Sequence, residues 1–247
     1  MAAELAIIGG TGLTSLKTLE ITRREVVSTP YGEPSGPLTH GVLAGREVVF
    51  LPRHGDGHTI PPHRINYRAN IWALRQIGVK RVVAVAAVGG IRADMAPGCI
   101  AIPDQIIDYT WSRGHTFFED DLTHVTHVDF TRPYCEELRA ALIAACRNAD
   151  IAVIENGTYG AMQGPRLETA AEINRMERDG CDMVGMTGMP EAALAREAEL
   201  CYAACAVMAN WAAGRSDGEI TMEEIEHHLK GGMEKVRALL EHLIPLL

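Results

Sequence analysis

The sequence lacks the features that mark several large classes of protein. It contains no run of basic residues, and its 32 acidic side chains against 23 basic ones give a formal net charge of −9. Proteins that bind nucleic acid usually carry a basic stripe, so this balance disfavours a nucleic-acid partner. No stretch reaches the ~18–20 uninterrupted apolar residues of a membrane span. Residues 1–9 contain Glu4 and no cationic start, which predicts a first strand instead of a signal peptide and hence a cytoplasmic protein.

Cysteine patterns that bind metal are also missing. The sequence has no CxxC pair, and Cys201 and Cys205, which lie four residues apart, have no nearby histidine. Zinc sites need ligand pairs at short spacing, so we expect no metal site. Thiols in a reducing compartment usually fill small buried spaces. We expect that role for all six cysteines, which are Cys99, Cys135, Cys146, Cys181, Cys201 and Cys205.

The composition that remains is typical of a globular α/β protein. Hydrophobic residues make up 47% of the chain and charged residues 22%, and the length suits a single domain over residues 1–247. Runs rich in Val, Ile and Ala predict strands at residues 5–8, 48–51, 82–88, 100–107, 152–162 and 202–208. Helical patterns lie between them at residues 66–77, 133–147, 168–178 and 190–200, and a capping box at Thr221 opens a last helix that reaches about Leu240. Strands that are apolar on both faces and alternate with helices predict a mostly parallel or mixed sheet with both faces covered.

Three of the expected strands run into residues suited to binding an anion. Gly9-Gly10-Thr11-Gly12 follows the first strand, Arg53-His54-Gly55 follows the second, and the third runs through Ala86 and Ala87 into Gly89-Gly90. Glycines let backbone N–H groups approach a ligand, while an arginine fork with a histidine as second donor can clamp a phosphate-sized anion. Alone, each motif also fits a tight turn, a surface arginine or close packing. Together they favour an anion site, because ligands bind α/β sheets at the carboxyl ends of strands.

Two polar residues later in the chain have a structural and a functional interpretation. Glu168 begins the helix expected at residues 168–178, where it is either a partner of the helix dipole or a buried acceptor for a ring N–H. Asn210 ends the last strand and is either a turn former or an amide that reads a base. The dinucleotide fingerprint G-x-G-x-x-G and the P-loop lysine are absent, which argues against a nucleotide-dependent dehydrogenase. A non-catalytic nucleoside-binding module would leave the phosphate clamp without a purpose.

The motifs occur together in an order that resembles a known family. They are Gly9–Gly12, Arg53–Gly55, Asn66–Leu74, Gly164–Arg166 and Met186–Glu191. Over essentially its full length the chain resembles the trimeric purine nucleoside phosphorylases and methylthioadenosine phosphorylases. The resemblance implies a single domain with a central mixed, barrel-like sheet flanked by helices, assembled as a homotrimer. It also implies phosphorolysis of a purine nucleoside with inorganic phosphate as co-substrate and without a metal or cofactor.

The resemblance also assigns site residues by position. The phosphate site matches Thr11, Arg53, His54, the backbone of Ala87, and Thr187. Met186 matches a ribose-binding methionine, and the base-binding positions are Leu167, Glu168, Asn210 and Ala212. His127 matches a histidine that the neighbouring subunit lends to the 5′ end of the ligand. Asn210 and His54 are the expected catalytic residues, Asn210 by stabilising the charge that develops at N7 and O6 of the purine.

Departures from the family pattern predict the substrate. Adenosine-type relatives carry two aspartates where this chain has Asn210 and Ala212, and a serine where it has Glu168, and the Glu168–Asn210 pair is similar to inosine and guanosine phosphorylases. A carboxylate accepts from N1–H of a 6-oxopurine and repels the lone pair of adenine N1. The Asn210 amide can donate to O6 and N7, and Ala212 offers nothing to a 6-amino group. Each buried mispair costs ~1–3 kcal/mol, so two predict roughly hundredfold discrimination or more.

The expected 5′ pocket is apolar. Met222 and Ile225 share a helical face near the start of the last helix, in the region where inosine phosphorylases use a histidine for the 5′-hydroxyl. The two side chains either line a methylthio pocket or belong to the core. With the base selection, they predict cleavage of S-methyl-5′-thioinosine to hypoxanthine and 5-methylthioribose 1-phosphate. A methylthioadenosine phosphorylase and a general inosine or guanosine phosphorylase remain the alternatives.

Overall fold

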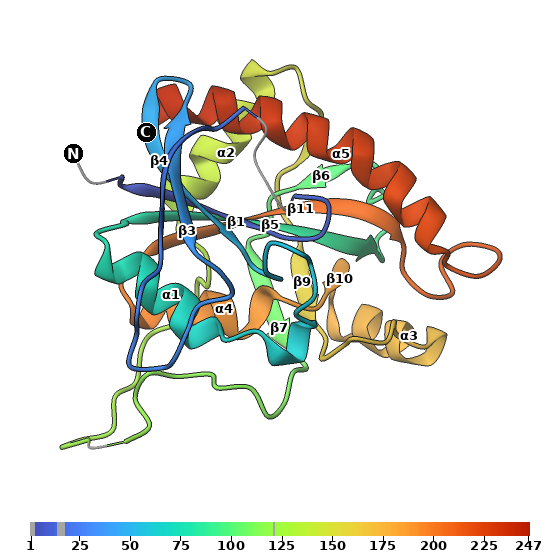
Figure 1. The fold of residues 1–247 in the computed structure, drawn as a ribbon. Coiled ribbons are helices and arrows are strands. Elements are labelled where there is room, and N and C mark those ends of the chain that lie inside the picture. The colour runs from blue at the N-terminus through green and yellow to red at the C-terminus, as the bar shows by residue number, and fades with distance from the viewer. Residues whose placement is uncertain (1–2, 14–17, 121) are drawn as a thin grey trace.

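The computed structural model describes residues 3–13, 18–120 and 122–247 (Figure 1). Within these residues, eleven strands form one mixed sheet in the order β2-β3-β4-β1-β5-β10-β9-β7, and β11 joins β5 to β6, which pairs with β8. The strands are β1 (Leu5–Gly9), β2 (Glu20–Glu25), β3 (Leu38–Leu43), β4 (Arg46–Pro52), β5 (Arg81–Gly90), β6 (Ile100–Ala101), β7 (Gln105–Asp108), β8 (Val153–Ile154), β9 (Thr158–Ala161), β10 (Met183–Gly185) and β11 (Cys201–Trp211). The expected mixed sheet flanked by helices is confirmed.

Helices cover both faces of the central strands. The helices are α1 (Tyr67–Gln76), α2 (Glu136–Asn148), α3 (Ala170–Asp179), α4 (Gly188–Glu197) and α5 (Met222–Leu243), with short 3₁₀ helices η1 (Pro62–Arg64) and η2 (Ile244–Leu246). Figure 1 shows α2 and α5 on one side of the sheet and α1 and α4 on the other. Along β1, Ala6 and Ile8 pack in the core that contains α1 and α4, whereas Leu5 and Ile7 pack in the core that contains α2 and α5. This explains why the strand is apolar at every position.

Two of the expected strands are each divided in two. Residues 100–107 form β6 and β7, and residues 152–162 contain β8 and β9. Pro103 lacks a backbone N–H for a ladder bond, and the second break falls at Gly157, whose φ is +155°. The backbone N–H of Gly157 donates to the Asp104 carboxylate at 2.8 Å, so the two breaks lie side by side. The chain changes partner strands there, which a continuous apolar run does not reveal.

The helices near the site begin as local capping chemistry dictates. Thr169, not Glu168, caps α3, and the Thr169 hydroxyl and the Glu172 carboxylate form a capping box. Glu168 therefore lies just before the helix and is not part of its first turn. The Thr221 hydroxyl accepts from the backbone N–H of Glu224 and caps α5, as expected, and α5 continues through Gly231 and Gly232 to Leu243. A Cβ on Gly232 would lie 2.4 Å from Val207 Cγ1, so glycine lets α5 lie close against β11.

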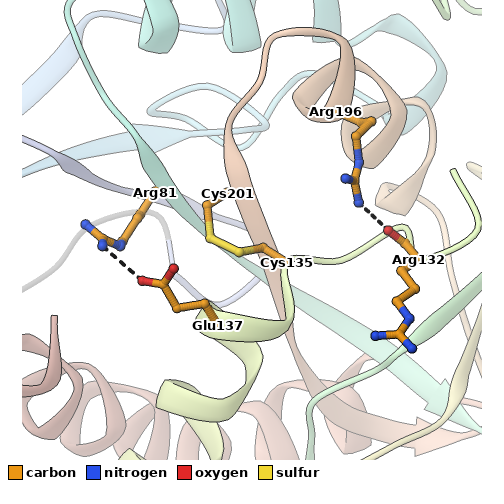
Figure 2. Close-up of a disulfide and its surroundings, with 6 residues drawn as sticks. All are labelled: Arg81, Arg132, Cys135, Glu137, Arg196 and Cys201. Carbon is orange, nitrogen blue, oxygen red and sulfur yellow. Dashed lines mark hydrogen bonds and ion pairs between the residues drawn. A yellow bond between two sulfur atoms is a disulfide. The ribbon is translucent and has the colours of Figure 1, made fainter. Parts of the chain in front are cut away.

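The expectation of six free cysteines is wrong. Cys135, just before α2, and Cys201, the first residue of β11, form a disulfide across 66 residues of chain (Figure 2). The backbone N–H of Cys135 also donates to the Tyr202 carbonyl at 2.8 Å, so the two segments are joined twice. Cys146, Cys181 and Cys205 are buried thiols, and Cys99 is half-buried. A disulfide requires the two Cα atoms to lie about 5–6 Å apart. The sequence alone does not show which distant cysteines meet this requirement.

Candidate active site

A cavity of about 250 Å³ lies where β1, β4, β5 and β11 reach their carboxyl ends, with β10 and the start of α5 beside them. Eleven of the thirteen residues expected at the site line it. They are Thr11, Arg53, His54, Ala87, Leu167, Glu168, Met186, Thr187, Asn210, Met222 and Ile225. The fold thus brings together segments that span more than 200 residues of sequence. Among the described residues, no group of three or more His, Cys, Asp or Glu side chains is placed to hold a metal ion.

Arg53 is the buried cation of the anion end. Its guanidinium is 1% exposed and is held by the carboxylate of Glu191, which is fully buried, at 2.6 Å from Nε and 2.8 Å from Nη2. Nη1 donates to the Val85 carbonyl at 2.9 Å. Burial opposes the charged form of Arg53, but Glu191 outweighs it and raises the arginine pKa above its ordinary value. A guanidinium has five N–H groups, so these contacts leave one on Nη1 and one on Nη2 for an anion.

His54 lies beside Arg53 as a neutral imidazole. Burial and the charge of Arg53 lower its pKa to about 4. The Nδ1–H group donates to the Ile60 carbonyl at 2.8 Å, which leaves Nε2 with a lone pair. In this state His54 is an acceptor, and not the second donor that the sequence suggested.

His58 also lines the cavity, although it is not among the residues expected at the site. Its ring lies 4.6 Å from the His54 ring, and its Nε2 lies 3.5 Å from the Thr11 hydroxyl. The φ of His58 is +51°, a left-handed conformation in the turn that follows β4. His58 lies four residues after His54 in the sequence, and this short spacing is the signal that could have placed it near the site.

Glu191 is the other site residue that the sequence analysis missed. It belongs to the motif Met186–Glu191, of which only the first two residues received roles. The Tyr202 hydroxyl donates to the same carboxylate at 2.8 Å, so Glu191 joins α4, β11 and Arg53. An arginine expected inside an α/β core needs a buried acid, and that requirement could have identified Glu191.

Glu168 and Asn210, the two polar residues expected to bind a base, both line the cavity. Burial raises the pKa of the Glu168 carboxyl above its ordinary value. The Asn210 Nδ2 donates one hydrogen to the Trp211 carbonyl at 2.7 Å, which leaves its second hydrogen and the amide oxygen free of that bond. A Cβ on Gly89 would lie 3.4 Å from Asn210 Nδ2, so the glycine keeps the approach to this amide open.

Ala212 is one of two expected residues that do not line the cavity. It is 1% exposed and packs in a small apolar cluster with Ile91, Ile173 and Val184. The cluster lies behind Gly89, where a Cβ would meet the Ala212 Cα at 3.3 Å. Ala212 thus backs the base end and presents no polar group to it.

His127 is the second expected residue outside the cavity. It is exposed on the segment between β7 and α2, which projects from the body of the molecule in green and yellow-green in Figure 1. Met222 and Ile225, expected to line a 5′ pocket, both line the cavity, with Met222 62% exposed and Ile225 8% exposed. His127 of the same chain does not contribute to this apolar part of the cavity.

The same cavity is lined by a buried arginine, a carboxylate and an amide, the groups expected for an enzyme that joins phosphate to a purine nucleoside. A sequence profile described as the phosphorylase superfamily matches residues 4–245. The chain therefore belongs to the phosphorylase superfamily.

Known relatives are similar over nearly the whole chain. A probable S-methyl-5′-thioinosine phosphorylase of Pseudomonas syringae pv. tomato is 57% identical over 239 residues, which cover 97% of each chain. A 6-oxopurine nucleoside phosphorylase of Pyrococcus furiosus is 49% identical, covering 98% of this chain and 92% of its own. The solved structure of a methylthioadenosine phosphorylase from Schistosoma mansoni with adenine superposes with a TM-score of 0.95 at 33% identity, covering 99% and 91%.

Proposed function

We propose that this protein is a nucleoside phosphorylase, a pentosyltransferase that cleaves S-methyl-5′-thioinosine with inorganic phosphate. The products are hypoxanthine and 5-methylthioribose 1-phosphate, which makes the enzyme part of purine salvage. The reaction needs no metal or cofactor, because phosphate is the second substrate and the purine itself accepts the bonding electrons. Four relatives named as probable S-methyl-5′-thioinosine phosphorylases, at 55–57% identity, support the proposal.

The observation that carries this proposal is the pairing of Glu168 and Asn210 on one cavity with no acid at position 212. A carboxylate there accepts from N1–H of hypoxanthine, while the free amide hydrogen of Asn210 donates to N7 or O6. Adenine reverses the donor and acceptor at positions 1 and 6, and leaving such buried groups mispaired costs ~1–3 kcal/mol each. The raised pKa of Glu168 is compatible with this, because binding to a ring N–H stabilises the charged carboxylate.

The apolar 5′ end favours a methylthio group over a hydroxyl. Met222 and Ile225 both line the cavity and offer no hydrogen-bond donor or strong acceptor to a 5′-hydroxyl. Burying an unpaired hydroxyl costs ~1–3 kcal/mol, whereas a methylthio group gains from contact with apolar carbon and sulfur. Two alternatives are a general 6-oxopurine nucleoside phosphorylase and a methylthioadenosine phosphorylase. Relatives with these names are 49% identical, in Pyrococcus furiosus, and 47% identical, in Hyperthermus butylicus.

The proposed mechanism separates the two ends of the cavity. The bond from C1′ to N9 breaks first, and the ribose gains oxocarbenium character while electrons flow into the purine. Asn210 stabilises the charge that develops at N7 and O6. Phosphate, held by Thr11, Thr187, the Ala87 backbone and the two free N–H groups of Arg53, supports the cationic sugar from the opposite face and attacks C1′ with inversion. Fixing phosphate in line with C1′ contributes much of the rate.

Because His54 is neutral, we propose that phosphate binds as the monohydrogen form, with its hydroxyl facing His54. Its Nε2 lone pair accepts from the phosphate hydroxyl, so the remaining oxygens carry the negative charge toward Arg53 and C1′. Met186 lines the cavity directly before Thr187, and we assign it to packing against the ribose.

We further propose that the enzyme is a cytoplasmic homotrimer. Among the described residues, no helix has the length and apolar character to cross a membrane. The projecting segment between β7 and α2 carries exposed apolar side chains, with Trp111 65% and Val125 72% exposed. A neighbouring subunit would cover these side chains and receive His127 at its open 5′ end.

The test of the proposed function is product formation from S-methyl-5′-thioinosine with and without phosphate. We expect hypoxanthine and one equivalent of 5-methylthioribose 1-phosphate, with no base released when phosphate is omitted. Asn210→Ala is the matched variant and should bind phosphate but release base at least about a hundredfold more slowly. Tight nucleoside binding without base release would indicate a binding module instead, and release without phosphate would indicate a hydrolase.

A further inference from the structure

Arg113 is a buried arginine whose partners are almost all backbone carbonyls. It lies at the root of the projecting segment and is 8% exposed. Nη1 donates to the carbonyls of Met186 at 2.8 Å and Met189 at 2.6 Å. Nη2 donates to the carbonyls of Gln163 at 2.8 Å and Met162 at 3.3 Å, and Nε donates to the Gln163 side chain at 3.2 Å. The whole guanidinium fork is thus engaged by two segments that are more than 20 residues apart in sequence.

Both of these segments continue directly into the walls of the cavity. Residues 162–163 precede Pro165, Leu167 and Glu168, which line its base end. Residues 186–189 include Met186 and Thr187, which line the ribose and phosphate positions. Arg113 itself does not line the cavity, so it can affect a ligand only through these walls.

A third wall is tied to the same guanidinium. Nη1 lies 3.2 Å from the Tyr67 hydroxyl, which donates to the Pro62 carbonyl at 3.0 Å, and Pro62 also lines the cavity. The guanidinium carbon lies 5.4 Å from the centre of the Tyr67 ring, a cation–π contact. Within the described part of the chain, no carboxylate forms an ion pair with Arg113. Carbonyl dipoles and one ring therefore balance its charge, and its planar fork, not a counter-ion, determines how it is held.

We propose that Arg113 is a positioning residue that fixes the base and ribose walls relative to each other and so sets the affinity for the nucleoside. The proposal rests on the proposed function, because it assigns these walls to a nucleoside. Lysine has the same charge but carries its N–H groups on one nitrogen, and it cannot span carbonyls on two segments as the fork does. Phosphate depends mainly on Arg53, whose guanidinium is held by Glu191 and Val85 and not by Arg113.

Arg139 provides a matched control in the same chain. It is 6% exposed, and its guanidinium donates to the backbone carbonyls of Ile102, Pro103 and Glu155 and also pairs with the Glu136 carboxylate. None of these residues lines the cavity. A change to Arg139 therefore reproduces the loss of a buried, carbonyl-bound fork without disturbing the proposed nucleoside walls.

The kinetic experiment compares Arg113→Lys with Arg139→Lys by initial rates at varied nucleoside and varied phosphate. For Arg113→Lys we expect the nucleoside KM to rise about tenfold or more, while the phosphate KM changes less than about threefold. Tyr67→Phe is a milder variant that loses the hydroxyl joining Arg113 to Pro62 but keeps the bonds from Arg113 to the carbonyls, and it should raise the nucleoside KM by a smaller factor in the same direction. Arg139→Lys should leave both KM values within about twofold of the wild type. Unchanged nucleoside KM in both Arg113→Lys and Tyr67→Phe, or a fall in kcat alone, would overturn the proposal.

Backbone hydrogen exchange of the unliganded protein tests the same proposal without any activity. Arg113→Lys should speed exchange in residues 162–168 and 186–190 by about tenfold or more, and Arg139→Lys should do so only around residues 102–104 and 155. Equal protection of 162–168 in Arg113→Lys and the wild type would overturn the proposal. Should the wild type cleave no purine nucleoside, the proposed function fails while this comparison still decides whether Arg113 holds the walls.

Discussion

Glu191 orients Arg53 in the proposed phosphate site, because its two carboxylate oxygens hold the guanidinium so that one N–H of each terminal nitrogen remains free. In Glu191→Gln only one oxygen remains to accept, and the buried cation loses its counter-charge. We expect the phosphate KM to rise about tenfold or more and the free energy of unfolding to fall by about 3–5 kcal/mol. Initial-rate kinetics at varied phosphate and urea denaturation measure the two effects.

Tyr202→Phe is the matched control, since it removes one hydroxyl from the same carboxylate and leaves both bonds to Arg53. It should cost only about 1 kcal/mol of stability and leave the phosphate KM nearly unchanged. A Glu191→Gln variant with wild-type affinity for phosphate would contradict this account of the anion site.

His54 makes the stability of the protein depend on pH. Its pKa is lowered from 6.5 to about 4 by burial and by Arg53, so between these values the unfolded chain binds a proton that the folded chain does not. Stability is therefore fully present above pH 6.5 and falls as the pH drops towards 4, by up to about 3 kcal/mol from this group. Urea unfolding at several pH values should show a shallower slope over this window for His54→Asn than for the wild type. An equal slope in His54→Asn and the wild type would show that His54 is not the source.

The disulfide between Cys135 and Cys201 joins α2 to β11, flanked by the Arg81–Glu137 ion pair and by a hydrogen bond from Arg196 to the Arg132 carbonyl (Figure 2). Closing a loop of 66 residues restricts the unfolded chain. Chain-entropy arguments assign about 4 kcal/mol to such a loop, and measured values are typically about 2–4 kcal/mol. Cys201→Ser should therefore lower the free energy of unfolding by about 2–4 kcal/mol.

Dithiothreitol provides the internal check on this value. It should lower the stability of the wild type by the same amount and leave Cys201→Ser unchanged, while Cys99→Ser should retain the full response to the reductant. Equal stability of the reduced and oxidised wild type would contradict a stabilising role for the bond.

The main strands and helices could be predicted because the chain's periodicity reflects its packing. β1, β4, β5 and β11 are buried on both faces, and each is a short apolar run in the sequence. β2 is an exposed edge strand with the sequence Glu-Ile-Thr-Arg-Arg-Glu, and β10 has three residues, so neither has an apolar pattern long enough to detect. Glu168 could be placed near a helix start, but its position before the cap depends on the choice between two neighbouring capping residues.

Site residues could be predicted where neighbouring residues in the sequence form a recognisable binding motif, as in Arg53-His54-Gly55 and Met186-Thr187. It could not be predicted where function depends on pairs that only the fold brings together. Arg53 and Glu191 lie 138 residues apart, and the two ends of the disulfide lie 66 apart. The sequence does not show which residues pair, because it offers each charged group or thiol many possible partners. Only the fold determines which of them comes within bonding distance.

At the scale of the whole molecule, the open 5′ end and the exposed His127 predict that assembly completes the site. A trimer of 26.8 kDa chains should sediment at about 80 kDa. His127→Ala should assemble normally and raise the KM for the methylthio nucleoside several-fold, by about 1 kcal/mol of lost contact. Mixed trimers of His127→Ala and Asn210→Ala chains should show active sites with the wild-type KM, because some sites then combine an intact Asn210 with an intact His127. Sedimentation as a monomer with full activity would contradict the shared site.

The preference for a 6-oxopurine is the central claim, and the ratio of kcat/KM for S-methyl-5′-thioinosine to that for S-methyl-5′-thioadenosine measures it most directly. With Glu168 and Asn210 on the cavity wall, the wild type should favour the 6-oxo nucleoside by about a hundredfold or more. Glu168→Gln, whose amide can donate to adenine N1, should reduce this ratio about tenfold or more at unchanged phosphate KM. A wild-type enzyme that cleaves the 6-amino nucleoside as well as or better than the 6-oxo nucleoside would contradict the account.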